Sequence, residues 1–439
     1  MFGTDGIRAF PYKEPLTAKT LIKIGYAYGI FLKKKDVLTS NIFFSKDTRK
    51  SSNYIENNLI KGVNLAGLTA IRLGVLPTSS LSIFTTKYPY SGGMMITASH
   101  NDYQYNGIKF LNQNGEKITK DDEKIIIDIL KKGIKERNLK IKNIYYENSL
   151  KEYTDEIVEK FEGCKLKKFK LAIDLSNGAS FRATPVILSK LKIDFKAISV
   201  LPDGFNINRN CGVENYKKIS NYVTRNRFDF GVAIDGDADR IIFVDRNGTY
   251  VEGDKILNFI ASNILKKGSK LVTTVMTNNI LDTNLRKKGI SVVKTDVGDK
   301  NVYSKMKENS SLFGGENSGH YILRDYLNTS DANLNLILIL KVLSENKLNF
   351  DIISKMKLNP AILKSFDIKE KKSLSTIPQI RSFIKNFRKQ YKSKAFLNIR
   401  YSGTEHKIRI LVQYHKLDVI YHEINKFEAI VNELNYDKT

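Results

Sequence analysis

Short apolar runs alternate with longer amphipathic stretches along the whole chain, and this alternation constrains the fold more than any other feature. Residues 41–45 form one such run and predict a strand. Residues 52–66 predict a helix, because Ile55, Leu59 and Val63 recur at the spacing of one helical face. Strands and helices that alternate in this way are typical of layered domains, so we expect an α/β fold.

Two further strand and helix units support this prediction. Residues 170–175 predict a strand before a helix that follows Gly178. Residues 270–275 precede a helix near residues 279–288 and a strand at residues 291–294. In the helix at residues 52–66, Asn53 and Glu56 stand at capping-box spacing, which predicts that they close its first turn.

The chain has 439 residues, which is too long for one hydrophobic core. Domain boundaries are expected in the lysine-rich segment 131–150, at the Asn247-Gly248 turn and at the Asn359-Pro360 junction. These boundaries predict four domains, at residues 1–148, 149–248, 249–359 and 360–439. No low-complexity linker separates them, so we expect the domains to pack around shared clefts.

The formal net charge is +26, from 72 Lys and Arg residues and 46 Asp and Glu residues. Such a charge could indicate nucleic acid, an anionic membrane surface or anionic small substrates as partners. The lysines are spread evenly, which indicates a compositional bias and is compatible with attraction of an acidic substrate. Nucleic-acid binding would require a concentrated basic stripe with interleaved aromatic residues, and the sequence has none, so no nucleic-acid partner is expected.

The N-terminus does not resemble a secretory signal, because Thr4, Asp5 and Arg8 interrupt it. The most apolar stretch, residues 334–343, is too short to span a bilayer, so no membrane partner is expected. We therefore expect a soluble cytoplasmic protein, whose oligomeric state, monomer or homodimer, the sequence leaves open. The two cysteines show no metal-binding spacing and are expected to be ordinary thiols.

Three carboxylates at alternate positions, Asp235, Asp237 and Asp239, stand between two apolar strand-like runs. Acids this close repel one another unless a cation lies among them, and oxygen ligands suit Mg²⁺, Mn²⁺ or Ca²⁺. An EF-hand is excluded, because Arg240 and Arg246 occupy the positions where that calcium loop needs Gly and Glu. A solvated acidic turn is the alternative, but the flanking strands and Arg240 favour a metal site.

A candidate nucleophile follows the strand predicted at residues 92–97. Ser99 stands on a polar turn directly after that strand, and His100 and Lys109 are near enough in the sequence to assist proton transfer. The alternative is an ordinary loop with a capping serine. The motif is not GxSxG, so acyl transfer has no support.

Two later loops contain glycine beside polar side chains. Residues 314–320 surround Glu316, Ser318 and His320 with three glycines, which suits hydrogen bonding to sugar hydroxyls, although a structural turn is the alternative. Residues 400–405 combine an arginine, hydroxyls and a glycine turn, a composition that can bind phosphate. Together the four loops indicate a phosphosugar enzyme with a metal, a nucleophilic serine, a polyol-binding loop and a phosphate-binding loop.

The same loops resemble those of a known family. The strings FGTDGIR, TASHN, NGIKF, DGDADR, GGENSGH and RYSGTE occur in the order and at the spacing of the α-D-phosphohexomutases, and the resemblance runs from end to end. Shorter strings agree as well, among them DTR at residues 47–49 and VGDK at residues 297–300. Within that family the chain is most similar to the bacterial phosphoglucosamine mutases.

The resemblance implies four domains around a central cleft, three of similar mixed α/β fold and a smaller α+β domain at the C-terminus. In chain order they would carry the phosphoserine loop, the metal-binding loop, the sugar-binding loop and the phosphate-binding loop. The implied reaction converts glucosamine 6-phosphate to glucosamine 1-phosphate, with glucosamine 1,6-bisphosphate as intermediate and activator, and supplies amino-sugar nucleotide and cell-wall precursors. Phosphomannomutase or phosphoglucomutase activity is the alternative, and a basic protein that binds sugar phosphates or nucleic acid without turnover is a third hypothesis.

The family mechanism also implies roles for individual residues near the reacting phosphate. Ser99 would carry the phosphoryl group, and one Mg²⁺ per chain would bind Ser99 and the carboxylates of Asp235, Asp237 and Asp239. Positive charge around that centre would come from Arg8, Lys109 and Arg240. Lys109 or His100 would move the proton of the attacking hydroxyl.

The phosphosugar substrate would be held by two further groups implied by the resemblance. Glu316, Ser318 and His320 would bind the sugar. The non-reacting phosphate would be bound by Arg400, Ser402, Gly403, Thr404 and Arg409.

Some positions depart from the family pattern. Asp102 and His406 stand where proline is usual, so both turns are expected to be looser or shifted. Gly403, where many phosphomannomutases and phosphoglucomutases have Asn, favours the glucosamine substrate. None of the departures removes a principal catalytic residue.

Overall fold

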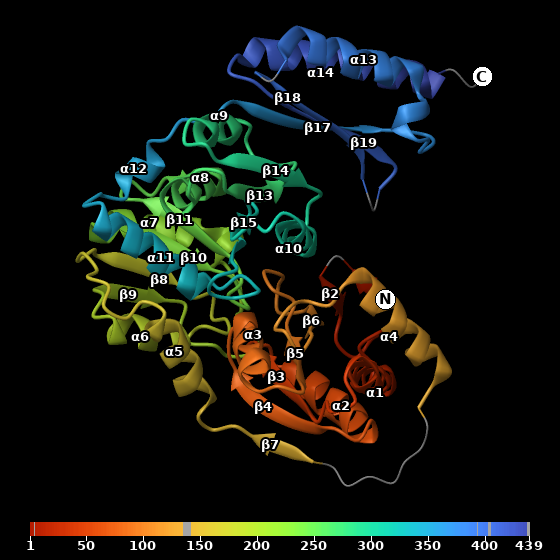
Figure 1. Cartoon of the computed structure of the whole chain (residues 1–439), viewed down its shortest axis with the longest axis vertical. Coiled ribbons are helices and arrows are strands. Elements are labelled where there is room, and N and C mark those ends of the chain that lie inside the picture. The colour runs from red at the N-terminus through yellow and green to blue at the C-terminus, as the bar shows by residue number, and fades with distance from the viewer. Residues whose placement is uncertain (4, 135–141, 393, 403–404, 437–439) are drawn as a thin grey trace.

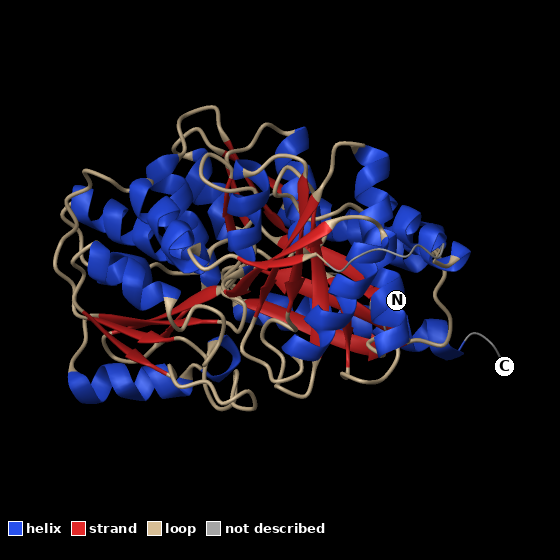
Figure 2. Cartoon of the chain, turned by 90° about the horizontal axis from the view of Figure 1, so that it is seen from below, coloured by secondary structure: helices blue, strands red, loops and turns tan. Residues whose placement is uncertain are grey.

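Four separate β-sheets, each with its own helices, form the chain in the computed structural model, which describes residues 1–3, 5–134, 142–392, 394–402 and 405–436. We call the units built around these sheets the first to fourth modules, in chain order (Figure 1). Strands lie inside and helices cover them, as Figure 2 shows. The predicted α/β class with a smaller C-terminal module is confirmed.

The first module contains a seven-stranded sheet of order β1-β2-β6-β5-β3-β4-β7. The strands are β1 (Phe2–Gly3), β2 (Gly6–Ala9), β3 (Asn41–Lys46), β4 (Thr69–Val75), β5 (Ser91–Ile96), β6 (Asn106–Leu111) and β7 (Asn143–Tyr145). The helices are α1 (Ala18–Lys35), α2 (Ser52–Leu65), α3 (Thr78–Lys87) and α4 (Lys120–Lys132). Successive residues of β3 point to opposite faces, so Ile42 and Phe44 pack in one buried core with α1, α2 and α4, while Phe43 packs in another with α3.

The second module has the sheet order β12-β11-β10-β8-β9. Its strands are β8 (Leu171–Asp174), β9 (Phe195–Ile198), β10 (Phe230–Ile234), β11 (Ile241–Asp245) and β12 (Tyr250–Val251). Its helices are α5 (Ser149–Glu159), α6 (Ala183–Lys190) and α7 (Lys217–Asn226), with a 3₁₀ turn, η1 (Val213–Asn215), before α7. β12 pairs with β11, so this sheet extends past the boundary predicted at residue 248.

The third module has the sheet order β14-β13-β15-β16. It comprises β13 (Lys270–Thr274), β14 (Ser291–Thr295), β15 (Phe313–Gly315) and β16 (Tyr321–Leu323), with α8 (Gly253–Ile264), α9 (Ile280–Arg286), α10 (Asp299–Glu308), α11 (Ala332–Glu345) and α12 (Asp351–Ser354). The apolar stretch 334–343 lies in α11, whose hydrophobic side chains belong to one buried core shared by the first three modules. Of the helices in the described ranges, none has the length and apolar character needed to cross a membrane.

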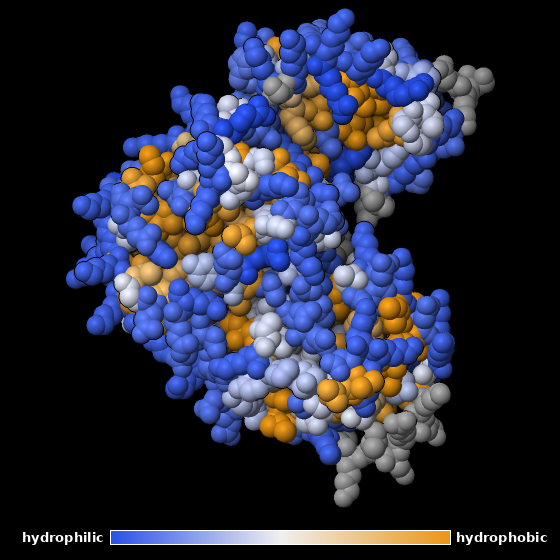
Figure 3. Space-filling model, viewed as in Figure 1, coloured by the Kyte–Doolittle hydropathy of each residue, from blue (hydrophilic) through white to orange (hydrophobic). Residues whose placement is uncertain are grey.

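The fourth module has a core of its own and a three-stranded sheet of order β17-β19-β18. Its elements are β17 (Ala361–Asp367), η2 (Leu374–Thr376), α13 (Pro378–Tyr391), β18 (Phe396–Tyr401), β19 (Lys407–Gln413) and α14 (Leu417–Tyr436). Amide side chains join it to the third module: Gln413 Oε1 accepts the Asn279 N–H at 2.7 Å, and Asn278 Nδ2 donates to the Asn359 carbonyl at 2.8 Å. The surface is hollowed between this module and the first one (Figure 3).

The helix predicted at residues 52–66 is α2, but the predicted capping box is wrong. The N-cap residue is Ser51, and its side chain makes no capping hydrogen bond. Glu56 Oε2 instead accepts hydrogen bonds from Lys46 Nζ at 2.5 Å and Arg72 Nη1 at 3.0 Å. The Glu56 side chain therefore belongs to a buried ion-pair cluster and does not make the helix cap that its spacing predicts.

Helices α1 and α2 touch backbone to backbone where they cross. A Cβ atom on Gly62 would lie 2.0 Å from the Ile22 carbonyl oxygen, and one on Gly25 would lie 2.1 Å from the Leu59 carbonyl oxygen. Only hydrogen side chains fit at these two positions.

We expect Gly62→Ala to lower the free energy of unfolding by about 2 kcal/mol, because the added methyl group forces the two helices apart. This loss should exceed the intrinsic helix preference of alanine over glycine, which is about 1 kcal/mol. Chemical denaturation measures the change, with Lys61→Ala on the exposed side of the same helix as the control. A Gly62→Ala protein as stable as the wild type would contradict the close crossing.

Candidate active site

Three of the four loops singled out in the sequence line one cavity of about 490 Å³ between the first three modules. The serine loop, between β5 and β6, contributes Ser99 and His100. The acid loop, between β10 and β11, contributes Asp239 and Arg240. The glycine loop, at residues 314–320, contributes Glu316, Ser318 and His320. Arg8 and Lys109 also line it. The structure thus brings together most of the residues expected to act on the substrate.

Ser99 lies at the turn between β5 and β6, at the edge of the first sheet. It is only 2% exposed, and its φ angle of 51° lies in the left-handed region, which is unusual for a residue other than glycine. Its Oγ donates a hydrogen bond of 2.7 Å to Asp235 Oδ2. The hydroxyl of the predicted nucleophile therefore touches the acid loop of the second module.

The acid loop connects β10 to β11, which pair antiparallel with Ile234 opposite Ile241. The buried carboxylates of Asp235, Asp237 and Asp239 each offer an oxygen, and these oxygens lie within 4.8 Å of one another. Among the described residues, the Oδ1 atoms of Asp237 and Asp239 are buried and have no hydrogen-bond partner. Buried carboxylate oxygens without partners suit a hard divalent cation, so this triad could hold a metal ion.

Lys109, on β6, brings a buried positive charge to the same carboxylates. Its Nζ lies 2.7 Å from Asp237 Oδ2, 2.7 Å from Asp239 Oδ2 and 3.1 Å from Asp5 Oδ2. Burial alone would lower the pKa of Lys109, but the three carboxylates raise it well above its ordinary value. Lys109 therefore stays an ammonium ion at neutral pH.

The three acids of the loop do not share one electrostatic environment. Burial and the charges of Asp237 and Asp239 raise the pKa of Asp235 well above its ordinary value. Burial acts on Asp239 in the same direction, but the charges of Lys109 and Lys117 outweigh it and hold the pKa of Asp239 well below that value. The carboxylate that accepts the Ser99 hydrogen bond, Asp235, is therefore harder to ionise than Asp239.

Sequence reasoning did not assign three charged residues that complete this centre, namely Asp5, Lys117 and Asp299. Lys117 Nζ lies 3.0 Å from Asp5 Oδ2, also contacts Asp299 Oδ2, and lies 3.7 Å from Asp239 Oδ2. Asp5 and Asp299 occur in FGTDGIR and VGDK, so the motif strings contained the signal. Lys117 follows β6 and belongs to no quoted string, so only the tertiary structure reveals it.

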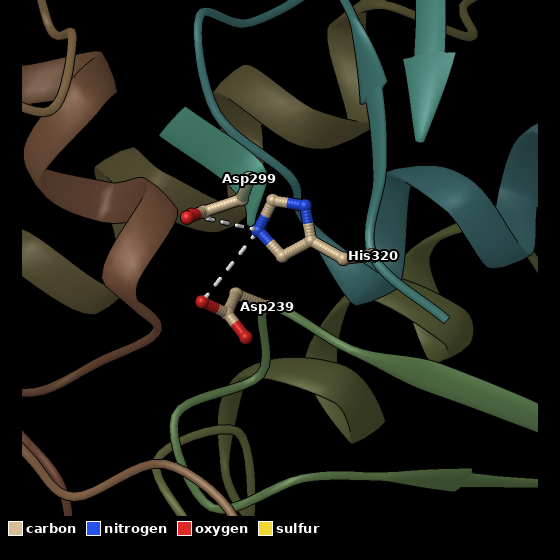
Figure 4. A group of neighbouring side chains, drawn as sticks. All are labelled: Asp239, Asp299 and His320. Atoms are coloured by element: carbon tan, nitrogen blue, oxygen red, sulfur yellow. Dashed lines mark ion pairs between the residues drawn. The ribbon is translucent and has the colours of Figure 1, made fainter. Parts of the chain in front are cut away.

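His320 lies beside Asp239 and Asp299, as Figure 4 shows. It is 3% exposed, and its Nε2 lies 3.5 Å from Asp299 Oδ2 and 3.7 Å from Asp239 Oδ2. Glu316, four residues earlier, accepts the Gly298 N–H at 3.0 Å through Oε1. The glycine loop is thereby fixed to the start of α10, while the exposed side chain of Ser318 faces the cavity.

His100, Arg8 and Arg240 line the cavity together with Ser99. His100 Nδ1 lies 3.4 Å from Ser99 Oγ, and burial together with the charges of Arg240 and Arg8 lowers the pKa of His100 to about 4. Arg8 Nη1 donates to Asn101 Oδ1 at 3.1 Å, and the Arg240 N–H donates to Asp235 Oδ1 at 3.0 Å. His100 is therefore neutral at pH 7 beside two positive side chains.

The described residues of the phosphate loop, Arg400, Ser402 and Arg409, lie on the fourth module and are not among the described residues that line this cavity. Arg400 on β18 and Arg409 on β19 are directly opposite each other, and the Nε atoms of both are buried without a hydrogen-bond partner among the described residues. Arg409 Nη2 contacts Glu405 Oε2 at 3.0 Å, and Ser402 is buried beside them. Gly403 and Thr404 lie outside the described residues.

Known proteins share both the sequence and the fold. Sequence models of the phosphoglucomutase/phosphomannomutase family match alpha/beta/alpha domain I at residues 1–137, domain II at residues 151–248 and domain III at residues 252–358. A phosphoglucosamine mutase of Ruminiclostridium cellulolyticum is 36% identical over 437 residues, which cover 96% of each chain. One from Campylobacter jejuni is 34% identical and covers 99% of each chain.

Solved structures agree in fold at low identity. A phosphoglucomutase/phosphomannomutase family protein of Burkholderia thailandensis has a TM-score of 0.82 at 18% identity and covers 99% of this chain and 97% of that one. An N-acetylphosphoglucosamine mutase of Aspergillus fumigatus, solved with GlcNAc-6P and magnesium, has a TM-score of 0.67 at 15% identity and covers 100% and 96%. The chain therefore belongs to the phosphoglucomutase/phosphomannomutase family, the α-D-phosphohexomutases that its motifs resemble, which are intramolecular phosphotransferases.

Proposed function

We propose that this protein interconverts glucosamine 6-phosphate and glucosamine 1-phosphate by moving a phosphoryl group between Ser99 and the sugar. The observation that carries the proposal is the buried Ser99 hydroxyl, hydrogen-bonded to the acid loop at the wall of a cavity that also presents Lys109, Arg8 and Arg240. The end-to-end identity to proteins named phosphoglucosamine mutase supports the choice of sugar. A cytoplasmic location and a monomer or homodimer stay predictions within this proposal.

In the proposed reaction, the phosphoserine form of Ser99 meets the O1 hydroxyl of glucosamine 6-phosphate. A bond forms between phosphorus and O1 as the bond between phosphorus and Ser99 Oγ breaks, which produces glucosamine 1,6-bisphosphate. The bisphosphate then presents its other end, and Ser99 Oγ takes the phosphoryl group from O6. Glucosamine 1-phosphate leaves, and Ser99 is phosphorylated again.

The proton of the attacking hydroxyl needs an acceptor, and the structure supports His100 over Lys109. A base must be unprotonated at the working pH, and His100 is neutral at pH 7 while Lys109 remains an ammonium ion. Nδ1 of His100 also lies within 3.4 Å of Ser99 Oγ, where the transferred group begins its path. Lys109 instead supplies positive charge beside the reacting phosphate.

Asp235, Asp237 and Asp239, together with an oxygen on Ser99, would hold one Mg²⁺ in this proposal. When bound, such an ion neutralises charge that develops on the transferring phosphoryl group. The fold keeps the three carboxylates together at the edge of the second sheet. Thr78 Oγ1 and Lys109 Nζ donate hydrogen bonds to Asp237 Oδ2 at 2.6 and 2.7 Å and so fix its position. The oxygen of Asp237 that remains free, Oδ1, is the one without a partner among the described residues.

The sugar would be bound by Glu316, Ser318 and His320, which line the cavity opposite the serine loop. Glu316 and Ser318 can form hydrogen bonds with hydroxyl groups, and neither ring nitrogen of His320 makes a hydrogen bond to another described residue. A solved N-acetylphosphoglucosamine mutase of Aspergillus fumigatus is described in complex with glucose 1,6-bisphosphate, which supports a bisphosphate as the species that turns over in the site.

The non-reacting phosphate would be held by the fourth module. Arg400 and Arg409 stand opposite each other on paired strands, where like charges repel. Glu405 contacts Arg409, and a bound phosphate would compensate the charge that remains. Arginine binds phosphate through two parallel hydrogen bonds, so this pair suits a phosphate dianion. We include Ser402, Gly403 and Thr404 in the same proposed phosphate site.

We expect the purified protein, with Mg²⁺ and a trace of hexose 1,6-bisphosphate, to convert glucosamine 6-phosphate with a higher kcat/KM than mannose 6-phosphate or glucose 6-phosphate. Ser99→Ala should reduce turnover to background, because it removes the hydroxyl that is proposed to carry the phosphoryl group. Coupled assays with the three sugars measure both results, and Ser304→Ala, on the exposed side of α10, is the control. A preference for mannose or glucose 6-phosphate would identify the protein as a phosphomannomutase or phosphoglucomutase.

Asp237→Asn should weaken binding of Mg²⁺ or Mn²⁺ and lower kcat on the order of 100-fold, because one full ligand charge is lost at the reacting centre. Calorimetric titration with the metal alone gives the affinity, and the mutase assay gives kcat. Asp128→Asn, which removes an exposed carboxylate from α4, should change neither. Unchanged metal affinity in Asp237→Asn would exclude this carboxylate as a ligand.

Attraction of the anionic substrate by the net charge of +26 should make kcat/KM fall several-fold as salt is added. The Debye length shortens from about 30 Å at 0.01 M to about 3 Å at 1 M ionic strength. The value of kcat should change much less, because bound substrate is already inside the cavity. A kcat/KM that does not respond to salt would mean that the net charge has no part in substrate capture.

A further inference from the structure

The backbone of the serine loop is held in a costly conformation. The left-handed region is unfavourable for a residue other than glycine, and Ser99 adopts it with a φ angle of 51°. Such a conformation persists only where surrounding groups determine it. Within the loop, the Ser99 N–H donates to Thr97 Oγ1 at 2.9 Å, and several carbonyl groups of the loop accept hydrogen bonds from donors outside it.

Arg49, in the short segment between β3 and α2, supplies most of these donors. The side chain is 2% exposed, and its two terminal nitrogens donate to four loop carbonyl oxygens, those of Ser99 (3.1 Å), Asn101 (2.7 Å), Asp102 and Tyr105 (3.0 Å). Its Nε donates to Asp47 Oδ2 at 2.9 Å. The two terminal nitrogens of the guanidinium group thus donate hydrogen bonds to the serine loop, while Asp47 compensates its positive charge.

Asp47 is itself fixed, so the guanidinium has little freedom to move. Its carboxylate accepts hydrogen bonds from Thr97 Oγ1 at 2.7 Å and Ser52 Oγ at 3.1 Å, as well as from the Arg49 N–H at 3.0 Å. Thr97 is the last residue before the serine turn. The same carboxylate therefore joins the end of β5 to the arginine that holds the loop.

Asn208 holds the same loop from the second module. Its Nδ2 donates to the Ser99 carbonyl oxygen at 2.8 Å and to the Asn101 carbonyl oxygen at 2.9 Å, two of the atoms that Arg49 also contacts. The Asn208 N–H donates to the Ser176 carbonyl at 2.9 Å, which fixes Asn208 to the second sheet. A Cβ atom on Gly236 would lie 2.5 Å from the Ser99 carbonyl oxygen, so the acid loop also packs directly against this point.

We propose that Arg49 and Asn208 are positioning residues, which hold Ser99 in its left-handed conformation so that Oγ faces Asp235 in the acid loop. Neither side chain contacts the cavity, and both act through the carbonyl oxygens of Ser99 and Asn101. Their position across two modules also fixes the distance between the serine loop and the acid loop. This inference rests on the proposed phosphoryl transfer at Ser99.

The experiment compares the wild-type protein with Asn208→Ala and Arg49→Lys. Alanine removes the two hydrogen bonds from Asn208, and lysine keeps the charge opposite Asp47 with three donors in place of five. Asn206→Ala is the matched control, because among the described residues the side chain of Asn206 forms hydrogen bonds only within its own loop, to Asp203 and Leu201. Thermal unfolding establishes that each variant is folded.

We expect Asn208→Ala and Arg49→Lys to lower kcat by about 10- to 100-fold, as misplacement of a reacting group by about 1 Å does. KM for glucosamine 6-phosphate should stay within about twofold, because the sugar and phosphate contacts are intact; loss through general instability would not produce this split. Ser99 phosphorylation by glucose 1,6-bisphosphate, followed by intact mass, should slow by the same factor. Amide hydrogen exchange of residues 98–105 should become faster in both variants and not in Asn206→Ala.

Failure of the two proposals can be told apart. A wild-type protein that turns over none of the three hexose phosphates would reject the proposed function, and hydrogen exchange of residues 98–105 would then decide whether the two side chains position the loop. Folded variants with wild-type kcat, or with unchanged exchange, would overturn the positioning role while mutase activity stands. If Arg49→Lys does not fold, Asn208→Ala decides the question.

Discussion

The first three modules meet around a set of buried charges, and the fold of the site depends on their mutual compensation. Lys109 joins Asp5 of the first module to Asp237 and Asp239 of the second, and Lys117 extends the set to Asp299 of the third. A buried charge that loses its partner costs several kcal/mol. Each module therefore supplies charged side chains that compensate the buried charges of the others. The acid loop can keep three carboxylates together out of water because two ammonium groups from the first module lie beside them.

Much of the architecture follows from local patterns. The strands predicted at residues 41–45, 170–175 and 270–275 are β3, β8 and β13, because short runs of apolar residues at these places are buried in the sheets. The acid loop was placed correctly between two strands for the same reason. The spacing wrongly predicts that Glu56 caps a helix. Its ion pairs with Lys46 and Arg72 depend on how α2 packs beside β3 and β4, which the local sequence does not show.

The sequence does not identify side chains whose role depends on contacts with residues far away in the chain. Lys117 stands in a polar hairpin, and nothing in its neighbours indicates three carboxylates from three modules. Arg49 belongs to a recognised string, yet its four bonds to the serine loop need the fold. Asp102 was expected to loosen the turn, but its carbonyl oxygen is one of those that Arg49 holds.

The cavity has walls from residue 3 to residue 320, and this has a consequence for synthesis of the chain. The first module, with Asp5 and Lys117, emerges from the ribosome before Asp299 and His320 have been synthesised. The nascent protein must keep these charges hydrated, and the centre can dehydrate only after the third sheet emerges. Assembly of this enzyme is therefore a late event in translation, and any shortened product that stops before His320 would carry the acidic loop and the serine without a working pocket.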